Sequence, residues 1–545
     1  MLTKLEGGYR YDPDQGLDGQ AGDIFIRDGR IVVDPGPGAR FDAVYNIRGC
    51  IVMAGAIDIH THIAGGNVNN ARLLLPERQI AMASARQRGW TAAGVGERYA
   101  QMGYTTLVEP AVLPCSAWQV HSEMEDIPIV DTAGLAILGN DDYLLRLFRD
   151  DCDQQAVNDY VAWVLEASRC LGIKVINAGG SNAFKQNVRS FGLDDTVPTY
   201  GVTSRRIIQR LQRAIMELGV AHPLHVHCNN LGMAGNVDTA VATMEAAEGL
   251  PMHLAHVQFY GYGSEGGRGF SPAAARLIEA WRRHPNITMD VGQVLFQPTV
   301  TISGDLIAQF NNRHAARPNK WVLNEAECEG GGGVVPYEYK SQSFVNTLQW
   351  AIGLELFLLA DDPARLFFTT DHPNGAPFTR YPDLIRLLMD ADHRAEIMAT
   401  VNQEALAMTL LPGLKREYSY YELAIMTRSA AARLLGLADR GNLLPGNVAD
   451  IAVYTPQDDK SAMFRHATLV FRRGELVIKD GEVVASPRGR ALCTAPEYAP
   501  RSLAGLRNYY DQYMTVSLNH LMVDIHNPAY FHADRFMTIK TPRQR

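Results

Sequence analysis

The sequence has few features that direct a chain to a membrane, to nucleic acid or to disulfide pairing. No apolar run approaches the roughly 20 residues of a membrane-spanning helix, and the first residues lack the pattern of a secretory signal. The seven cysteines are scattered, with no Cys-x-x-Cys spacing, which argues against a disulfide framework and a thiolate zinc site. A net charge of −8 without a basic block argues against nucleic acid. We expect a cytoplasmic protein that enters no membrane.

The composition is otherwise that of an ordinary globular protein. Of the 545 residues, 46% are apolar and 20% are charged, and a chain of this length is expected to form more than one domain. The first residues read as short strands with a hairpin turn at Asp28-Gly29, and similar strands with a turn at Asp480-Gly481 return near the other end. We therefore predict one composite β-sandwich domain from residues 1–50 and 438–490.

Between these ends, apolar runs alternate with helical patterns. The runs are residues 51–62, 103–112, 134–140, 172–180, 222–230, 252–261, 287–296 and 365–375. Apolar residues recur at helical spacing in residues 204–219 and 271–284. This order predicts an α/β fold, a (β/α)8 TIM barrel over residues 51–437, followed after the β domain by a C-terminal extension, residues 491–545. A doubly wound sheet is the alternative, but its Gly-x-Gly-x-x-Gly turn is missing.

Two histidines one residue apart end the first run, in the stretch DIHTHIAGG. Strand side chains alternate between faces, so His60 and His62 point the same way and can hold a metal together. Such a pair also occurs in ordinary strands where both rings are hydrogen-bonded, so the pair alone is a modest signal. If the first strand ends at the barrel mouth, further ligands are expected at the ends of later strands.

Later strands do carry such residues. His225 and His227 share a face, and the later one is the better ligand, which leaves His225 behind a ligand or in the core. His253 and His256 face opposite ways, so at most one enters the barrel, and His256 is nearer the mouth. Asp371 follows the apolar part of the last run and precedes His-Pro-Asn-Gly, where an aspartate can equally cap a helix or a turn.

A lysine stands inside the wholly apolar strand GIKVINAGG. Burying the ammonium of Lys174 is costly unless its charge is paired or removed. Reaction with carbon dioxide gives a carbamate, an anionic oxygen donor that can bridge two cations. The lysine is therefore a candidate metal ligand after modification.

Together these residues resemble the ligands of the amidohydrolase superfamily in its carbamylated-lysine, dinuclear form. The set is His60, His62, Lys174, His227, His256 and Asp371. The stretch GNLLPGNVADIAVY resembles the composite β domain of the same enzymes. The resemblance implies a barrel of amidohydrolase type with two divalent metal ions, taken as Zn²⁺, and N6-carboxylysine at position 174.

The same resemblance assigns roles to the ligands. The first two histidines and the aspartate bind the more buried metal, the lysine bridges, and His227 and His256 bind the exposed metal. The metals activate water and polarise a carbonyl oxygen. Asp371, at the eighth strand, is the predicted catalytic residue, acting as general base and then as general acid.

Longer motifs resemble a narrower family. They are GIKVINAGG, PLHVHCNNLG, HLAHVQFYGYG, KWVLNEAECEGGGGVVPYEYK and the opening YDPDQG with DIFIRDGRIV. All are similar to the A subunits of formylmethanofuran dehydrogenases, a family that includes a relative in the bacterial formyltransferase/hydrolase complex. The resemblance implies hydrolysis of an N-formylated methanofuran-type carrier to formate and free amine, within a complex that includes a formyltransferase subunit. The excess of arginine over lysine favours the bacterial, methylotrophic version.

Substrate contacts are expected next to the ligands. Asn177, Asn229 and Asn230 could hold the formyl or furan portion, although such asparagines also cap loops. The glycine-rich stretch from Glu329 to Val335 lacks the Gly-Lys-Ser/Thr ending of a phosphate loop. We expect it to form an active-site loop, with a flexible surface loop as the alternative.

Two other functions compete with this one. A stand-alone cyclic amidase of the hydantoinase or dihydroorotase kind would open rings without partner subunits. A catalytically silent scaffold would keep the barrel for assembly only, but scaffolds usually lose ligands and this chain retains all six. A dehydrogenase complex and a hydrolase complex would use the same chemistry in this chain.

Overall fold

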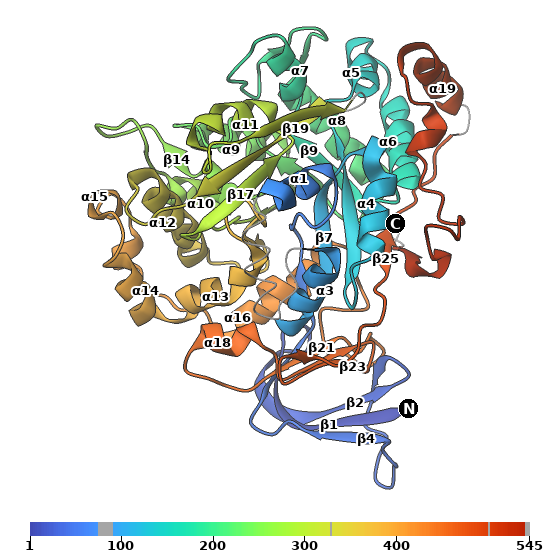
Figure 1. Ribbon diagram of the computed structural model, residues 1–545, viewed down its shortest axis with the longest axis vertical. Coiled ribbons are helices and arrows are strands. Elements are labelled where there is room, and N and C mark those ends of the chain that lie inside the picture. The colour runs from blue at the N-terminus through green and yellow to red at the C-terminus, as the bar shows by residue number, and fades with distance from the viewer. Residues whose placement is uncertain (75–90, 327–329, 500–501, 540–545) are drawn as a thin grey trace.

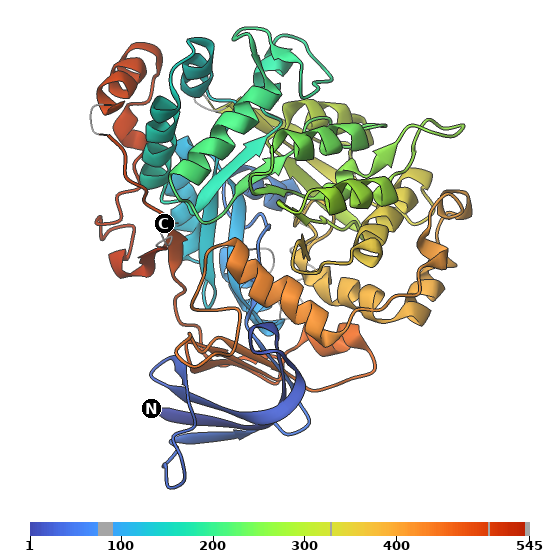
Figure 2. The same ribbon diagram turned by 180° about the vertical axis from the view of Figure 1, so that it is seen from behind.

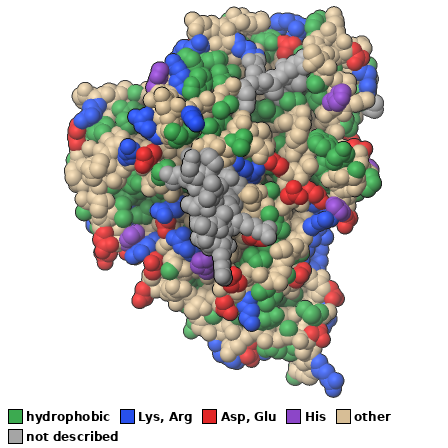
Figure 3. Space-filling view, viewed as in Figure 1, with side chains coloured by type: hydrophobic (Ala, Val, Ile, Leu, Met, Phe, Trp, Pro, Cys, Tyr) green, Lys and Arg blue, Asp and Glu red, His purple; other side chains and the backbone are tan. Residues whose placement is uncertain are grey.

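The computed structural model describes residues 1–74, 91–326, 330–499 and 502–539. A barrel of strands and helices forms the larger body, and a sheet built from both ends of the chain lies at its lower end in Figures 1 and 2. None of the helices in the described part of the chain combines the length and apolarity that crossing a bilayer requires. Lys and Arg side chains are interspersed with Asp and Glu on the face shown in Figure 3.

Parallel strands form the barrel, one in each of the apolar runs that the sequence predicts as strands. They are β6 (Ala56–Asp58), β7 (Tyr104–Val112), β8 (Asp131–Leu138), β9 (Gly172–Ile176), β12 (Leu224–His227), β13 (Met252–Leu254), β16 (Ile287–Asp290) and β20 (Leu366–Phe367). A parallel bridge between Thr61 and His372 brings the end of the first strand to the end of the last. The predicted barrel is confirmed, and side chains at the carboxyl ends of its strands meet at one mouth.

Helices cover the outside of the barrel. The two stretches with helical spacing form α8 (Ser204–Glu217) and α10 (Ala274–Arg283), and α8 begins where the Thr203 side chain accepts a hydrogen bond from Arg206 N. The other α-helices are α1 (Gly66–Leu74), α3 (Ala92–Gln101), α4 (Ala117–Glu125), α5 (Asp142–Arg149), α6 (Gln154–Ser168), α7 (Gly180–Lys185), α9 (Val237–Ala246), α11 (Leu306–Asn312), α12 (Phe344–Leu359), α13 (Tyr381–Met389), α14 (Ala391–Met398), α15 (Gln403–Leu406), α16 (Tyr420–Ala424), α17 (Ala430–Leu434), α18 (Lys460–Arg465) and α19 (Ser502–Tyr513).

The strands at the two ends of the chain form one continuous nine-stranded sheet. They are β1 (Leu2–Asp12), β2 (Leu17–Arg27), β3 (Arg30–Val32), β4 (Ala43–Asn46), β5 (Ile51–Ala54), β21 (Ile451–Tyr454), β22 (Leu469–Arg472), β23 (Glu475–Lys479) and β24 (Glu482–Val483). The two ends join where β5 pairs antiparallel with β21. Both predicted hairpin turns have their Asp-Gly pair at positive φ, at 50° and 80° for residues 28 and 29. The sheet therefore joins the two ends as predicted, while the domain boundaries stay a prediction.

The C-terminal extension packs on its own barrel. Strand β25 (Ala491–Cys493) pairs in parallel with the start of β8, and β26 (Phe536–Thr538) pairs with β25. Arg535 forms an ion pair of 2.7 Å with Glu125 of α4. Helix α19 lies beside α6 in both views (Figures 1 and 2). The extension thus adds two strands to the edge of the barrel sheet.

An insertion after β16 forms a small sheet at the barrel mouth. Its strands are β17 (Pro298–Ser303), β19 (Gly330–Glu338) and β18 (Val322–Ala326), with β19 in the centre. The predicted glycine-rich loop is wrong for residues 330–335, which lie in β19, and Glu329 lies outside the described residues. The glycines permit close packing here, because a Cβ at Gly332 would lie 2.3 Å from Asn67 Nδ2 and one at Gly333 would lie 2.5 Å from Gln309 Cβ. Short two-stranded pairs elsewhere are β10 (Thr196–Val197) with β11 (Val202–Thr203), and β14 (Tyr262–Gly263) with β15 (Ser271–Pro272).

One buried carboxylate joins the composite sheet to the barrel. Asp131, at the start of β8, forms ion pairs with Arg440, Arg472 and Arg473 and accepts a hydrogen bond of 2.6 Å from Arg490 N. Although burial alone raises the pKa of the Asp131 carboxyl, these arginines hold it well below its usual range. The carboxylate is therefore charged in the folded protein at every ordinary pH.

Asp131→Asn is expected to lower the free energy of unfolding by about 3–5 kcal/mol, because it leaves buried guanidinium groups without their anion. Since the folded-state pKa is depressed, the contribution of Asp131 is fully present above the unfolded-state value of about 3.9 and is lost as the pH falls through the folded-state pKa. Urea unfolding between about pH 5 and 8 should then show the same deficit throughout. Asp439→Asn, at a half-exposed partner of Arg440, is the matched control and should cost less than about 1 kcal/mol. Equal effects of the two substitutions would contradict the role of Asp131.

Candidate metal centre and active site

A cavity of about 650 Å³ opens at the mouth of the barrel, where the strands end. Its wall includes five of the six predicted ligands, His62, Lys174, His227, His256 and Asp371. The sixth, His60, is fully buried beneath them. The fold therefore gathers at one mouth side chains that lie far apart along the chain.

His60, His62 and Asp371 form the deeper part of this group. His60 Nε2 lies 2.9 Å from Asp371 Oδ1, and His62 Nε2 lies 3.4 Å from the same oxygen. Ligand atoms of the three residues all lie within 4.8 Å of one another. The backbone holds them there because His62 N donates to His372 O over 2.8 Å and so ties the first strand end to the last. These three side chains can surround one cation.

His227, His256 and Lys174 lie beside the deeper group. The rings of His227 and His256 have their centroids 4.7 Å apart, and Lys174 Nζ lies 3.3 Å from His60 Nε2. His256 adopts the left-handed conformation, with φ at 37°. Gly292 packs directly against it, because a Cβ at Gly292 would lie 2.5 Å from His256 Cβ. Five of the six predicted ligands therefore line the cavity, and the sixth, His60, lies against them, although the set comes from five different strand ends.

The donor atoms fit a metal site better than a set of hydrogen bonds. Asp371 Oδ1 and His256 Nδ1 are buried, yet neither has a hydrogen-bond partner of acceptable geometry among the described residues. Although burial alone raises the pKa of the Asp371 carboxyl, the nearby His60 and His256 hold it well below its usual range, so it is anionic. Imidazole nitrogens with a carboxylate oxygen suit zinc and similar divalent ions.

Lys174 is almost completely buried, with 2% of its surface exposed. Burial lowers the pKa of its ammonium group, against the opposing charge of Asp371. No carboxylate among the described residues forms an ion pair with Lys174 Nζ. Only the neutral amine reacts with carbon dioxide, and burial favours that form of Lys174 over the ammonium.

Three buried carboxylates lie behind the histidines, and none of them was predicted from the sequence. The pairs are Glu109 with His62 Nδ1 at 2.9 Å, Asp305 with His227 Nε2 at 3.2 Å, and Asp290 with His60 Nδ1 at 3.1 Å. A metal-binding histidine usually donates its second ring N–H to a carboxylate, which fixes the tautomer and leaves the opposite nitrogen for the metal. Each carboxylate therefore turns the free nitrogen of its histidine toward the cavity.

Two of these carboxylates had a signal in the sequence. Glu109 and Asp290 both stand in predicted apolar strands. Burying their charge is costly unless a partner offsets it, as for Lys174. Asp305 lies outside the predicted strands, between β17 and α11, and the sequence offers no comparable signal for it. Its carboxylate also accepts a hydrogen bond of 3.0 Å from Ala308 N and so begins α11.

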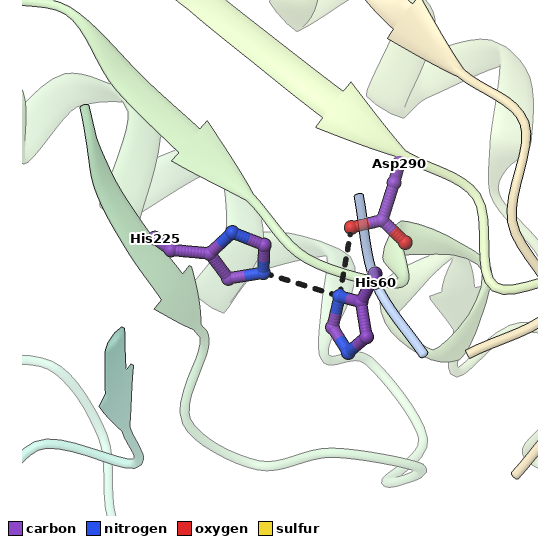
Figure 4. Close-up of side chains that lie close together, drawn as sticks. All are labelled: His60, His225 and Asp290. Carbon is purple, nitrogen blue, oxygen red and sulfur yellow. Dashed lines mark hydrogen bonds and ion pairs between the residues drawn. The ribbon is translucent and has the colours of Figure 1, made fainter. Parts of the chain in front are cut away.

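The two remaining strand histidines face away from the cavity. His225 Nε2 lies 3.1 Å from His60 Nδ1, next to Asp290, as Figure 4 shows. His253 contacts the Asp290 carboxylate over 3.0 Å on the same buried side. His225 thus lies directly behind a predicted ligand, His60. Of His253 and His256, only His256 lines the cavity.

None of the three predicted substrate asparagines is among the residues that line the cavity. Asn177 donates to Asp305 over 3.1 Å, and Asn229 donates to Ser204 Oγ over 2.9 Å. Asn230 accepts a hydrogen bond of 3.0 Å from Phe191 N. The structure thus uses these amides to hold neighbouring loops, and a contact with substrate stays a prediction.

The chain belongs to the amidohydrolase family, whose model matches residues 43–485. This membership defines it as a hydrolase, and its clusters of His and Asp indicate a site for divalent metal ions. The barrel fold described above is that of this class.

Two curated relatives match most of the chain. The A subunit of the formyltransferase/hydrolase complex Fhc from Methylorubrum extorquens is 49% identical over 503 residues, which cover 90% of this chain and 91% of the relative. Protein FwdA from Methanocaldococcus jannaschii is 36% identical over 495 residues, 86% of each chain. The X-ray crystal structure of the formyltransferase/hydrolase complex FhcABCD from Methylorubrum extorquens, with methylofuran, matches with a TM-score of 0.94 and 46% identity over 99% of this chain and 100% of that chain. The narrower resemblance found from the motifs is thereby confirmed.

Proposed function

We propose that this chain is the hydrolase subunit that cleaves the N-formyl amide of a formyl-methanofuran-type carrier to formate and free amine. One observation carries the proposal: five side chains with metal-ligand chemistry line a cavity, with His60 directly against them, in a chain that is 49% identical to the A subunit of an Fhc complex. The TM-score of 0.94 to a complex that contains methylofuran supports the same substrate class. The other subunits of such a complex, including a formyltransferase, are its proposed partners, and the bacterial cytoplasm is its proposed location.

We further propose two divalent metal positions, filled by Zn²⁺. His60, His62 and Asp371 would hold the inner position, His227 and His256 would hold the outer position, and Lys174 as N6-carboxylysine would supply a ligand to both. When bound, the metals supply an activated water and polarise the formyl carbonyl. The donor types, the buried Asp371 Oδ1 that lies between two histidine nitrogens without a well-aligned hydrogen bond among the described residues, and the three carboxylates behind the histidines support this assignment.

Asp371 is the proposed catalytic residue. Its Oδ1 lies at the inner position and its Oδ2 accepts a hydrogen bond of 2.8 Å from Asn374 Nδ2, which fixes the plane of the carboxylate. From there it takes a proton from the attacking water and passes it to the amide nitrogen as the C–N bond breaks. The amine then leaves in its neutral form, and the other product is formic acid, which releases its proton to solvent and becomes formate.

The upper cavity wall is suited to a furan ring. Leu231, Phe259, Phe270, Tyr337 and Tyr339 line it, and the last two rings have their centroids 4.7 Å apart. Flat aromatic walls hold a small heteroaromatic ring by stacking and exclude bulk water from the amide. The insertion that carries β17 and β19 therefore supplies part of the substrate site.

Formate release tests the proposed function. The purified protein, with any subunits that copurify, is expected to release formate from N-formyl furfurylamine-type amides and to open no hydantoin ring. Metal analysis by mass spectrometry of the same preparation is expected to find two tightly bound divalent ions per chain. Ring opening without formate release would favour a cyclic amidase, and less than one metal per chain with no activity would favour a silent scaffold.

A further inference from the structure

Asp290 ends β16, the seventh barrel strand, which carries none of the predicted metal ligands. The side chain is fully buried, and each of its two oxygens has two hydrogen-bonding contacts. Oδ2 contacts His60 Nδ1 at 3.1 Å and His253 Nε2 at 3.0 Å. Oδ1 accepts hydrogen bonds from His256 N at 3.0 Å and Thr369 Oγ1 at 2.6 Å. One carboxylate thus contacts a ligand of the inner position and a ligand of the outer position.

The contact with His60 fixes the tautomer of that ring. A carboxylate can only accept, so His60 Nδ1 must carry the proton and Nε2 keeps its lone pair for the inner position. A chain of histidines agrees with this assignment. His222 Nδ1 donates to the carbonyl of Leu434 at 3.3 Å, so its Nε2 accepts from His225 Nδ1, also at 3.3 Å.

The other nitrogen of His225 is then without a proton. Its Nε2 therefore presents a lone pair to His60 Nδ1 at 3.1 Å, so both neighbours of His60 Nδ1 are acceptors (Figure 4). Leu434 lies in the last turn of α17, where helix carbonyls have no intrahelical partner. The proton assignment is therefore consistent from the helix end to the metal site.

The contact with His256 acts on the backbone. His256 has φ at 37° and ψ at 52°, a left-handed conformation that few residues with a Cβ adopt. Its N–H donates to Asp290 Oδ1, and Thr369 Oγ1 holds the same oxygen from the last strand. Thr369 Oγ1 itself accepts from Gly292 N at 3.1 Å. The carboxylate thereby holds the strained turn that directs the His256 ring into the cavity.

The cluster of His60, His225 and Asp290 has the spacing of a cation site, with ligand atoms within 4.8 Å of one another. A third cation would require His60 to lose its Nδ1 proton and bridge as an anion. The hydrogen bonds already account for His60 Nδ1 and for the polar side-chain atoms of His225 and Asp290. The geometry therefore favours a network of positioning residues.

We propose that Asp290 is a positioning residue for both metal positions at once, through the His60 side chain and the His256 backbone. This inference rests on the two metal positions of the proposed function. Glu109 and Asp305 provide matched comparisons, because each is a buried carboxylate that contacts the ring of one ligand only. Glu109 serves the inner position and Asp305 serves the outer position.

The experiment compares zinc binding by the full-length protein and its Asp290→Asn, Glu109→Gln and Asp305→Asn variants. Each metal-free protein is dialysed against buffers of graded free Zn²⁺, and bound zinc is measured by mass spectrometry. Loss of such a carboxylate is expected to weaken binding by about 10- to 100-fold. Asp290→Asn should weaken both binding steps, whereas Glu109→Gln and Asp305→Asn should each weaken one.

Thermal unfolding of the metal-free variants separates positioning from general damage. The metal-free Asp290→Asn protein is expected to unfold within a few degrees of the metal-free Asp305→Asn protein, since both substitutions remove one buried charge. If Asp290→Asn gives no folded protein, Thr369→Val is the substitute test. It should weaken one zinc-binding step, whereas Thr369→Ser should bind zinc about as tightly as the parent protein. An unchanged Thr369→Val would then overturn the proposal.

The outcomes for the two proposals differ. The role of Asp290 is overturned if the parent protein binds two zinc ions and Asp290→Asn weakens only one zinc-binding step or neither. The proposed function then still stands. A third zinc ion in the parent that Asp290→Asn removes also overturns the role of Asp290, in favour of a cation site. A parent protein that binds fewer than two zinc ions contradicts both proposals.

Discussion

Asp371→Asn is expected to lower kcat for formate release by about 10⁴-fold, the upper end of what a positioned acid or base contributes. The carboxylate has two tasks in the proposed function, because its Oδ1 faces both His60 and His62 and the group is proposed to carry the proton to the leaving nitrogen. Asparagine has nearly the same shape, so the loss should appear in kcat and in inner-position zinc while the melting temperature of the metal-free protein changes little. Steady-state formate assays with metal analysis of each sample provide the measurement.

Asp362→Asn is the matched control for this substitution. Asp362 is a partly exposed aspartate just before β20 that pairs with Arg365 at 2.7 Å, far from the cavity wall. Its removal should leave kcat within about twofold, since surface ion pairs contribute little. An Asp371→Asn protein that keeps a tenth of the parent activity would show that another group transfers the proton.

The gathering of these side chains at one mouth was predictable because strand geometry is local, whereas their role as metal ligands stays a prediction. His60 and His62 share a face by the alternation of side chains along a strand, and a barrel places strand ends at one mouth. The same alternation separates His253 from His256, and the structure has only the later one in the cavity wall. Short-range periodicity and one rule of architecture were therefore sufficient for these residues.

The carboxylates behind the ligands depend on contacts that no local pattern contains. Asp290 and His60 are 230 positions apart in the chain, and Asp305 reaches His227 from an insertion that the barrel rule does not describe. A buried charge in an apolar run was a usable signal for Glu109 and Asp290. Which histidine each carboxylate would meet depends on how strands pair around the barrel, and this is a property of the whole fold.

Side-chain direction in the loops was the least predictable feature of the site. Asn229 follows His227 closely, but its amide bonds to Ser204 at the start of α8 instead of facing the cavity. Glycines 330–333 suggested a loop because glycine is flexible, whereas in β19 the missing Cβ atoms of Gly332 and Gly333 let α1 and α11 pack close. Adjacency along the chain and backbone freedom do not determine which group a residue meets.

Lys174→Met is expected to lower formate release by about 10²-fold or more, because it removes the ligand that we propose both metal positions share. Methionine fills a similar volume in the buried strand without a charge, so the barrel should remain folded. Zinc analysis should find less than two ions per chain in this variant. Lys185→Met, at an exposed lysine near the end of α7, is the control and should keep two ions and full activity.

Bicarbonate provides the sharper version of the same test. In the modification, the neutral Lys174 nitrogen attacks the carbon of carbon dioxide and loses a proton, which leaves a carbamate with a single negative charge. Metal-free protein reconstituted with Zn²⁺ in carbon-dioxide-free buffer should recover little activity, and added bicarbonate should restore it. Isotopically labelled bicarbonate should then appear in the restored parent protein and be absent from Lys174→Met.

The direction of the bicarbonate effect follows from the charge at position 174. An ammonium group 3.3 Å from His60 Nε2 would repel the inner cation, whereas a carbamate would attract both cations. Burial already lowers the pKa of this amine, which favours the neutral form that captures carbon dioxide. Zinc binding and carbamate formation should therefore promote each other, so bicarbonate should raise zinc affinity as well as activity. Equal zinc uptake with and without bicarbonate would mean that Lys174 acts as an unmodified amine and that the two metal positions share no bridge.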